Sequence, residues 1–198
     1  MKFSRVLIGL LVFWSAAGAT SQKSVYRNRE FGIVLPIPSG TLPCIPPVYV
    51  GNGVDHGPQI LLGTKDGSLC SKSSGKRYVG VFASYTTTDE EKTLRSSLES
   101  LCTNLPPIEN DPGAVCSPAP ADLSFNALPS EAARIKHSNG WIEIIVVTQA
   151  GEPDPDFDAS VPSMSYELSL YTDANHLDED LAVFRTVLKT IKIAPPHR

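Results

Sequence analysis

Six runs of the chain alternate apolar and polar residues or are rich in β-branched and aromatic residues, and both patterns predict strands. From Ser165 to Leu170, every second side chain is apolar, which is typical of a strand with one face against a core. The six runs cover residues 31–37, 59–63, 77–87, 131–138, 141–149 and 164–172. Because most of these runs follow one another without an intervening helix, we expect a mainly antiparallel sheet and the α+β fold class.

One tight turn is predicted between two of these runs. Ser138, Asn139 and Gly140 separate them, and Asn-Gly accepts the positive φ angles that a two-residue hairpin turn requires. Trp141 follows this turn and begins the run richest in β-branched residues, so we expect its ring to pack onto the sheet.

Two stretches show the helical period. In residues 87–105, Thr88 and Glu91 form a capping-box pattern, and Pro106 ends the run. The apolar positions of this stretch are Leu94, Leu98, Leu101, Cys102 and Leu105. Residues 175–193 predict a C-terminal amphipathic helix with acids in its first turn and Lys189 and Lys192 in its last, as the helix dipole favours. Its apolar stripe is Leu177, Leu181, Phe184, Val187, Leu188 and Ile191.

The order of these patterns resembles the PsbP-like family. The resemblance rests on Tyr26 with FGIVLPIP at 31–38, a mid-chain helix, hairpin strands, YELSLYT at 166–172 and the terminal RTVLKTIKI at 185–193. It implies an α/β/α sandwich, a central antiparallel sheet packed by amphipathic helices, in domains that bind or scaffold partners. The four cysteines and the Gly/Pro-rich loop region 39–76 depart from that family, so no functional residue is transferred.

The N-terminus has the order of a secretory signal peptide. Lys2 and Arg5 precede an apolar stretch and a small-residue end at Ala17-Gly18-Ala19, which predicts a signal peptide over 1–19 with cleavage after Ala19. We expect residues 20–198 to form one globular α+β domain, exported to the periplasm or the extracellular space. No other segment has the roughly 20 apolar residues of a membrane span, so none is expected in the mature chain.

Charge argues against nucleic acid as a partner. Residues 1–19 hold two of the 17 basic residues and none of the 21 acidic ones, so 15 basic and 21 acidic residues remain, a net charge of −6. A mildly acidic chain without a Lys/Arg run lacks the basic surface that nucleic acids and anionic membranes require.

The four cysteines predict two disulfides. An even number of cysteines in an exported chain favours disulfides over metal binding or thiol catalysis, and no CxxC pair is present. Three pairings of Cys44, Cys70, Cys102 and Cys116 are possible. We favour Cys44 with Cys70 and Cys102 with Cys116, because each pair closes a segment rich in turn-forming residues.

The sequence GNGVDHGPQILLG at 51–63 contains the best candidate for chemistry. His56 beside Asp55 could act as a general base with an orienting carboxylate, but adjacent residues seldom direct their side chains at each other in extended chain. No nucleophile motif accompanies them. The alternative is a glycine-shaped turn before a strand, in which Asp55 and His56 bond to backbone groups.

Four carboxylates alternate in GEPDPDFDAS at 151–160. Oxygen ligands of this kind suit Ca²⁺, but the EF-hand pattern fails, since Ala159 stands where glycine is required and Ser165 where the bidentate glutamate belongs. The candidate metal ligands are Glu152, Asp154, Asp156 and Asp158. A solvated hairpin tip and a contact surface for a basic partner are the alternatives.

These features favour a non-enzymatic function. We expect an exported, disulfide-stabilised binding module of the cell envelope that takes a protein partner or a small ligand, with no cofactor except Ca²⁺ as a possibility. One alternative is an immunity or inhibitor protein against a secreted enzyme, with the acidic segment facing a cationic site. The other is an envelope hydrolase that uses His56.

Overall fold

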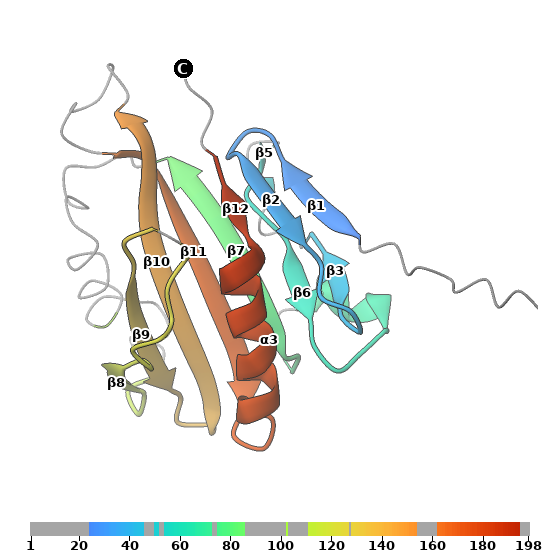
Figure 1. The fold of residues 1–198 in the computed structure, drawn as a ribbon. Helices are drawn as coiled ribbons and strands as arrows, with labels where there is room; N and C mark the ends of the chain where they lie inside the picture. The colour runs from blue at the N-terminus through green and yellow to red at the C-terminus, as the bar shows by residue number, and fades with distance from the viewer. Residues whose placement is uncertain are drawn as a thin grey trace, which may run out of the picture.

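The computed structural model describes residues 24–45, 50–51, 54–72, 75–85, 102, 111–126, 128–153 and 162–194 (Figure 1). The elements in chain order are β1 (Val25–Asn28), β2 (Ile33–Pro36), β3 (Leu42–Cys44), β4 (Val50–Gly51), β5 (Val54–Asp55), β6 (Gln59–Leu61), the 3₁₀ helix η2 (Gly67–Ser71), β7 (Tyr78–Tyr85), β8 (Val115–Pro118), β9 (Glu131–Lys136), β10 (Trp141–Pro153), β11 (Pro162–Asp173), α3 (Leu177–Thr190) and β12 (Lys192–Ile193). The predicted signal peptide at 1–19 lies outside the described residues.

A seven-stranded sheet in the order β3-β6-β7-β11-β10-β9-β8 forms the centre of the fold, and every pair of neighbours in it is antiparallel. The six predicted strands are all present, five of them in this sheet and the first as β2, so the expected mainly antiparallel sheet is confirmed. The predicted turn at 138–140 joins β9 to β10, and Gly140 has a φ of 86° there. The long strands β10 and β11 pair from Trp141 with Asp173 to Pro153 with Pro162.

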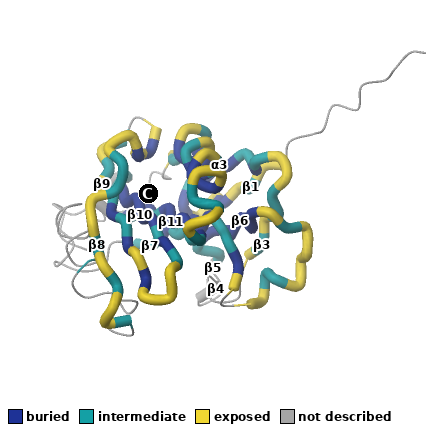
Figure 2. Tube along the Cα trace, turned by 90° about the horizontal axis from the view of Figure 1, so that it is seen from below, coloured by how far each residue is buried: buried dark blue, intermediate teal, exposed yellow. Residues whose placement is uncertain are grey.

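The core lies between one face of this sheet and a layer made of α3 and a second, three-stranded sheet in the order β1-β2-β12 (Figure 2). Alternation places Val79 and Val81 of β7 and Leu168 of β11 on this inner face. Phe184 of α3 and Phe31, which precedes β2, pack against it without exposure. The layer therefore holds the N-terminal and C-terminal parts of the domain on the same face.

The predicted C-terminal helix is confirmed, but it ends earlier than expected. It stops at Thr190, Ile191 is extended with ψ of 135°, and Lys192 pairs with Val34 of β2. Lys192 therefore does not lie in the last helical turn. The stripe continues through Ile191 because that side chain still packs into the core, although its backbone has left the helix.

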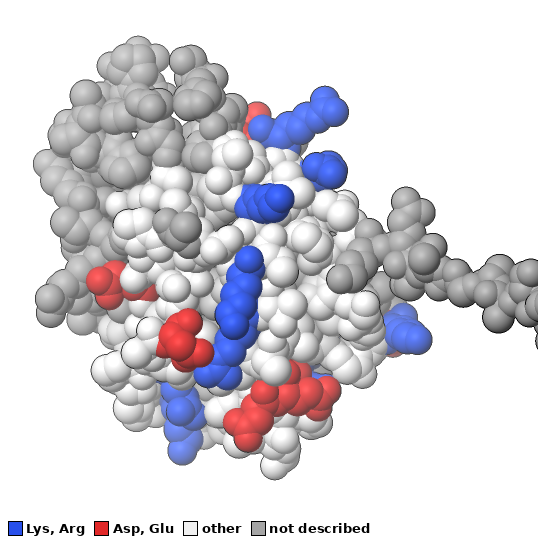
Figure 3. Space-filling view, viewed as in Figure 1, with Lys and Arg blue, Asp and Glu red and all other residues white. Residues whose placement is uncertain are grey.

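Charges along α3 follow the helix dipole, with acids near its N-terminal end and basic side chains further along, as Figure 3 shows for this face. Among the acids of the first turn, Asp180 differs because its side chain is buried, with 1% exposed. Arg77 donates to both of its carboxylate oxygens at 3.0 Å, and the Thr172 hydroxyl donates to Oδ2. This buried ion pair fixes α3 against β7 and β11 of the sheet.

The other face of the large sheet carries a small apolar cluster of Ile135, Ile145 and Val147. α3 is the one α-helix longer than a turn among the residues described, and it covers the inner face. Apart from Cys102, the helix predicted over 87–105 lies outside those residues. What the structure describes is therefore a sheet-rich fold with one helical layer, and the second helical layer of a sandwich remains an expectation.

Candidate functional site

Asp55 directs its carboxylate away from its neighbour His56. The Tyr26 hydroxyl donates to Asp55 Oδ2 at 2.8 Å, and the Gly57 amide donates to Oδ1 at 2.9 Å. The Asn28 side-chain amide donates to the Asp55 carbonyl oxygen. Burial, together with the bond to Asp55, raises the pKa of Tyr26 above its usual range. One carboxylate oxygen of Asp55 is therefore bonded to β1 and the other to the backbone of the turn at Gly57.

His56 lies between two aromatic rings. Its ring centroid is 5.5 Å from that of Phe31 and 5.0 Å from that of Phe82, both in stacked arrangement. Its Nδ1 lies 2.7 Å from the Ala83 carbonyl oxygen, and because a carbonyl only accepts, Nδ1 carries the proton. The His56 carbonyl accepts from the Ala83 amide at 2.8 Å.

Gly57 completes this arrangement. Its φ is 143°, and a Cβ at this position would lie 2.1 Å from the Val81 carbonyl oxygen, so the chain approaches β7 more closely than a side chain permits. We call Tyr26, Asn28, Asp55, His56 and Gly57 the Asp55 junction. Its described bonds are those of a turn that precedes β6 and holds the β1–β2 hairpin on β7. A chemical role for His56 stays a prediction.

The candidate metal ligands give no site to describe. Asp154, Asp156 and Asp158 lie outside the described residues, as does the side chain of Glu152, although the segment does join the paired strands β10 and β11. Within the ranges that the structure covers, no three His, Cys, Asp or Glu side chains are grouped to hold a metal ion. Calcium binding and the inhibitor hypothesis, which both depend on this segment, remain predictions.

The cysteines divide into two pairs. Cys102 and Cys116 form a disulfide with their Cα atoms 5.8 Å apart, as expected. Cys44 at the end of β3 and Cys70 in η2 carry free thiols, and these two elements lie against each other. Burial and the neighbouring Cys70 raise the pKa of Cys44 to about 12.

An apolar groove of about 400 Å³ lies between β1 and β3, and we call it the β1–β3 groove. Both strands are edges, β1 of the three-stranded sheet and β3 of the seven-stranded one. Its lining residues are Ser24, Val25, Tyr26, Ile37, Pro43, Cys44, Ile45 and Pro58. Val25 is 43% exposed and Ile45 47%, although both are large and apolar.

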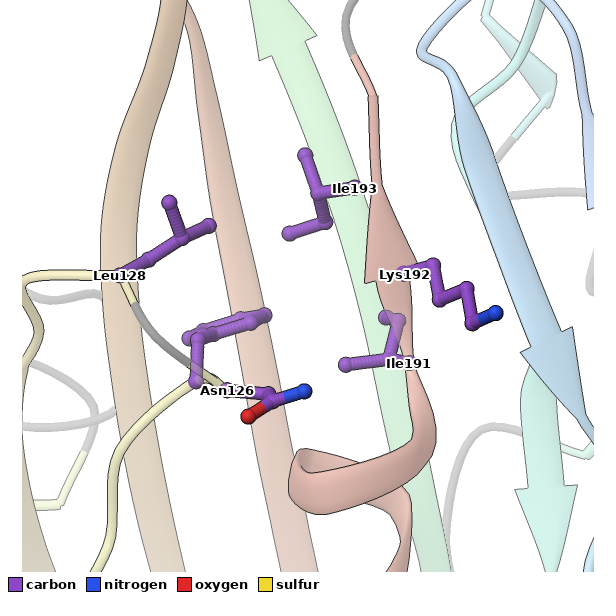
Figure 4. A pocket seen from close by; sticks show the side chains of 6 residues that line it. Asn126, Leu128, Ile191, Lys192 and Ile193 are labelled. Atoms are coloured by element: carbon purple, nitrogen blue, oxygen red, sulfur yellow. The ribbon is translucent and has the colours of Figure 1, made fainter.

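A second, smaller pocket of about 290 Å³ lies beside β12, and we call it the β12 pocket. Ile191 and Ile193 face Leu128 and Asn126 across it, while the Lys192 side chain extends away toward β2 (Figure 4). Its floor includes Phe125, which is only 2% exposed. Its apolar side chains belong to the core cluster or pack against it, so this pocket adjoins the core.

Sequence reasoning missed a cluster of ionisable groups around the β9–β10 turn. His137, 9% exposed, has Nδ1 3.4 Å from Asp111 and Nε2 3.4 Å from Glu143. Burial raises the pKa of Glu143, and the nearby His137 partly offsets this. The ring of Tyr171 packs edge-on to His137 and stacks on Trp141 at 4.8 Å. The sequence placed His137 beside a turn, but nothing in it indicated Asp111 as a neighbour.

Comparisons with known proteins identify the fold. No protein-family model and no curated protein sequence matches the chain. Among solved structures, the cyanobacterial PsbP protein CyanoP from Synechocystis sp. PCC 6803 superposes with a TM-score of 0.55 at 13% identity, over 92% of this chain and 99% of that one. LpqN of Mycobacterium tuberculosis, described as involved in cell envelope biogenesis, superposes with a TM-score of 0.51 at 12% identity, over 89% of this chain and 88% of LpqN. The predicted PsbP-like fold is therefore confirmed. At such identities the likeness concerns the fold alone.

Proposed function

We propose that the chain is an exported binding module of the cell envelope, and that its β1–β3 groove takes an uncharged apolar ligand. The observation that carries this proposal is the grouping of exposed apolar side chains. The described chain has three exposed large hydrophobic residues, Val25, Ile45 and Val115. Two of the three line this one groove. Apolar surface gathered in a concave site is what a ligand or partner covers.

The size and chemistry of the groove define the ligand class. A volume of about 400 Å³ falls within the range of small-molecule sites, which is roughly 300–1,000 Å³. The Tyr26 hydroxyl, the largest polar group on the wall, already donates to Asp55. No charged side chain is among the lining residues in the described part of the chain. A small apolar molecule, or the apolar end of a larger one, fits these walls without an unpaired charge.

Three features support the location. The first residues have the order of a signal peptide, the Cys102–Cys116 disulfide fits an oxidising compartment, and LpqN, which has a similar fold, is described as involved in cell envelope biogenesis. No helix in the ranges described has the length and apolar character needed to cross a bilayer. Fold likeness does not assign a ligand, so the groove itself supplies the argument.

The test uses the uncharged fluorophore N-phenyl-1-naphthylamine, whose emission rises in an apolar site. We expect saturable binding to the purified protein. Val25→Glu and Ile45→Glu each place a carboxylate on a groove wall, and each should weaken the Kd at least tenfold, or about 1.4 kcal/mol, because an apolar probe cannot pair the charge.

The matched control is Val115→Glu. Val115 lies on β8 and is 60% exposed, so the same substitution adds the same charge to an exposed apolar position at the opposite edge of the large sheet. It should leave the Kd unchanged. If all three variants bind the fluorophore alike, or if the wild-type protein does not bind it, the assignment of this groove is wrong.

A further inference from the structure

The pair Cys44 and Cys70 occupies a position that controls one wall of the groove. Cys44 is the last residue of β3 and lines the groove, while Cys70 lies in η2. β3 and η2 lie against each other, and Cys70 is near enough to Cys44 to contribute, after burial, to the raised pKa of its thiol. Both residues are partly exposed, which leaves them accessible to an oxidant in solution.

η2 has few other means of attachment. None of its five residues is buried, and its N-terminus is capped locally by Asp66, which accepts from the Ser68 amide at 2.9 Å. Lys76 links it to the domain, since its buried ammonium donates to the Leu69 carbonyl at 3.1 Å and the Cys70 carbonyl at 3.4 Å. A short 3₁₀ helix without buried side chains is weakly held, so a covalent bond from Cys70 to Cys44 would add a strong link between η2 and β3.

Two of the residues that line the groove, Ile45 and Pro58, belong to the chain between the two cysteines. Ile45 follows Cys44 directly, and Pro58 lies before β6 within the same excursion of the chain. A covalent bond between Cys44 and Cys70 would close this excursion at both ends. Ordering a binding site in advance lowers the entropy that a ligand must pay to bind.

We propose that Cys44 and Cys70 are a reversible redox pair whose disulfide fixes the β3 wall of the groove and strengthens ligand binding. The bond forms by exchange with the disulfide of an exported thiol oxidoreductase or a small-molecule disulfide. The Cys70 thiolate attacks one oxidant sulfur and releases the other as a thiolate. Cys44 then loses its proton and attacks Cys70 Sγ, which expels the second oxidant thiolate. The protein loses two electrons and two protons, and the oxidant disulfide takes them up and is reduced to two thiols.

The second pair has a different role. Cys116 lies in β8 and packs against the apolar cluster of the outer face, so the Cys102–Cys116 disulfide joins the sheet edge to the preceding chain, away from the groove. We therefore expect the two disulfides to differ in redox behaviour. Cys44–Cys70 should open first when the reduced glutathione concentration is raised.

The experiment titrates the whole protein with reduced and oxidised glutathione and counts alkylated thiols by peptide mass spectrometry. We expect Cys44 and Cys70 to become resistant to alkylation together, at a more oxidising buffer than Cys102 and Cys116. Hydrogen exchange in both redox states follows the amides of Leu42 and Cys44 and those of Gly67–Ser71. These amides should exchange at least tenfold more slowly in the oxidised protein, with α3 as an internal reference.

Ligand binding is the second readout, and this part rests on the proposed function. The oxidised protein should bind N-phenyl-1-naphthylamine at least threefold more tightly than the reduced one. Cys70→Ser should abolish the difference, because it leaves Cys44 on the groove wall without a partner. The double variant Cys102→Ser/Cys116→Ser should retain the difference.

The two readouts fail separately. The redox pair would be overturned if Cys44 and Cys70 still react with the alkylating reagent in oxidised glutathione, or if the exchange rates do not change with oxidation. Either result holds regardless of fluorophore binding. Equal affinity in both states would overturn its control of the groove. If neither state binds the fluorophore, the proposed function is wrong, and the exchange rates still decide whether the disulfide fixes β3.

Discussion

Replacement of His56 distinguishes a structural role from a chemical one. In His56→Ala, the ring that stacks between Phe31 and Phe82 is removed, and so is the hydrogen bond to the Ala83 carbonyl. Each aromatic contact contributes about 1 kcal/mol, and the hydrogen bond about 1 kcal/mol. We therefore expect His56→Ala to lower the free energy of unfolding by about 3 kcal/mol.

His56→Phe separates the two contributions. Phenylalanine keeps a ring between Phe31 and Phe82 but cannot donate to the Ala83 carbonyl, so the loss should be about 1–2 kcal/mol. Urea unfolding followed by Trp141 fluorescence measures both variants, with the m-value checked for constancy. Residues kept for catalysis commonly cost stability, and their removal is often neutral or stabilising. A loss below about 1 kcal/mol for His56→Ala would refute the structural account and return His56 to the list of chemical candidates.

Two further predictions concern buried charge. Asp180→Asn should lower the free energy of unfolding in urea by about 3 kcal/mol, because it leaves the partly buried Arg77 guanidinium without a counter-ion. The control Asp122→Asn, at the exposed ion pair with Arg185, should lower it by less than about 1 kcal/mol. Equal losses in the two variants would contradict the role assigned to burial. Burial, assisted by a neighbouring carboxylate, raises the pKa of Glu167 from 4.5 to about 7, so its contribution to stability is present below pH 4.5 and is lost as the pH rises through 7. As the pH is raised from 5 to 8, the urea midpoint should therefore decrease by an amount equivalent to about 2 kcal/mol. Glu167→Gln should flatten this part of the pH profile. An unchanged profile in the variant would show that other groups cause the pH dependence.

The sequence predicted the long elements well, because their signals are local and repeated. The strands now called β7, β10 and β11 have eight or more residues each, and the helical stripe of α3 extends over four turns. The short strands β1, β3 and β8 were missed. They have three or four residues each. The strands β2 and β6 are as short, but they lie within longer apolar runs that the sequence shows, whereas tertiary pairing decides the conformation of β1, β3 and β8.

The misplaced end of the C-terminal helix has a related cause. Ile191 continues the apolar stripe at helical spacing, so its burial is correctly predicted by a pattern that misstates its backbone conformation. Pairing of Lys192 with Val34 of β2, more than 150 residues earlier, competes with a further helical turn, and no local pattern can register that competition. The neighbours of His137 escaped prediction for the same reason, since Asp111 is brought to it by the fold.

The candidate site has two parts, the Asp55 junction and the β1–β3 groove, and the sequence indicated residues of the first part only. The sequence singled out Asp55 and His56, but it could not show that their partners are Tyr26 and the β7 backbone. Tyr26 is shared between the two features: its hydroxyl donates to Asp55, and its side chain lines the β1–β3 groove. The same bond that occupies the Asp55 carboxylate therefore joins β1 to the chain that leads to Pro58, which also lines the groove. A chemical role for Asp55 and His56 stays a prediction, while their described bonds join the chain before β6 to β1 and β7, next to the apolar groove in which we propose that a ligand binds.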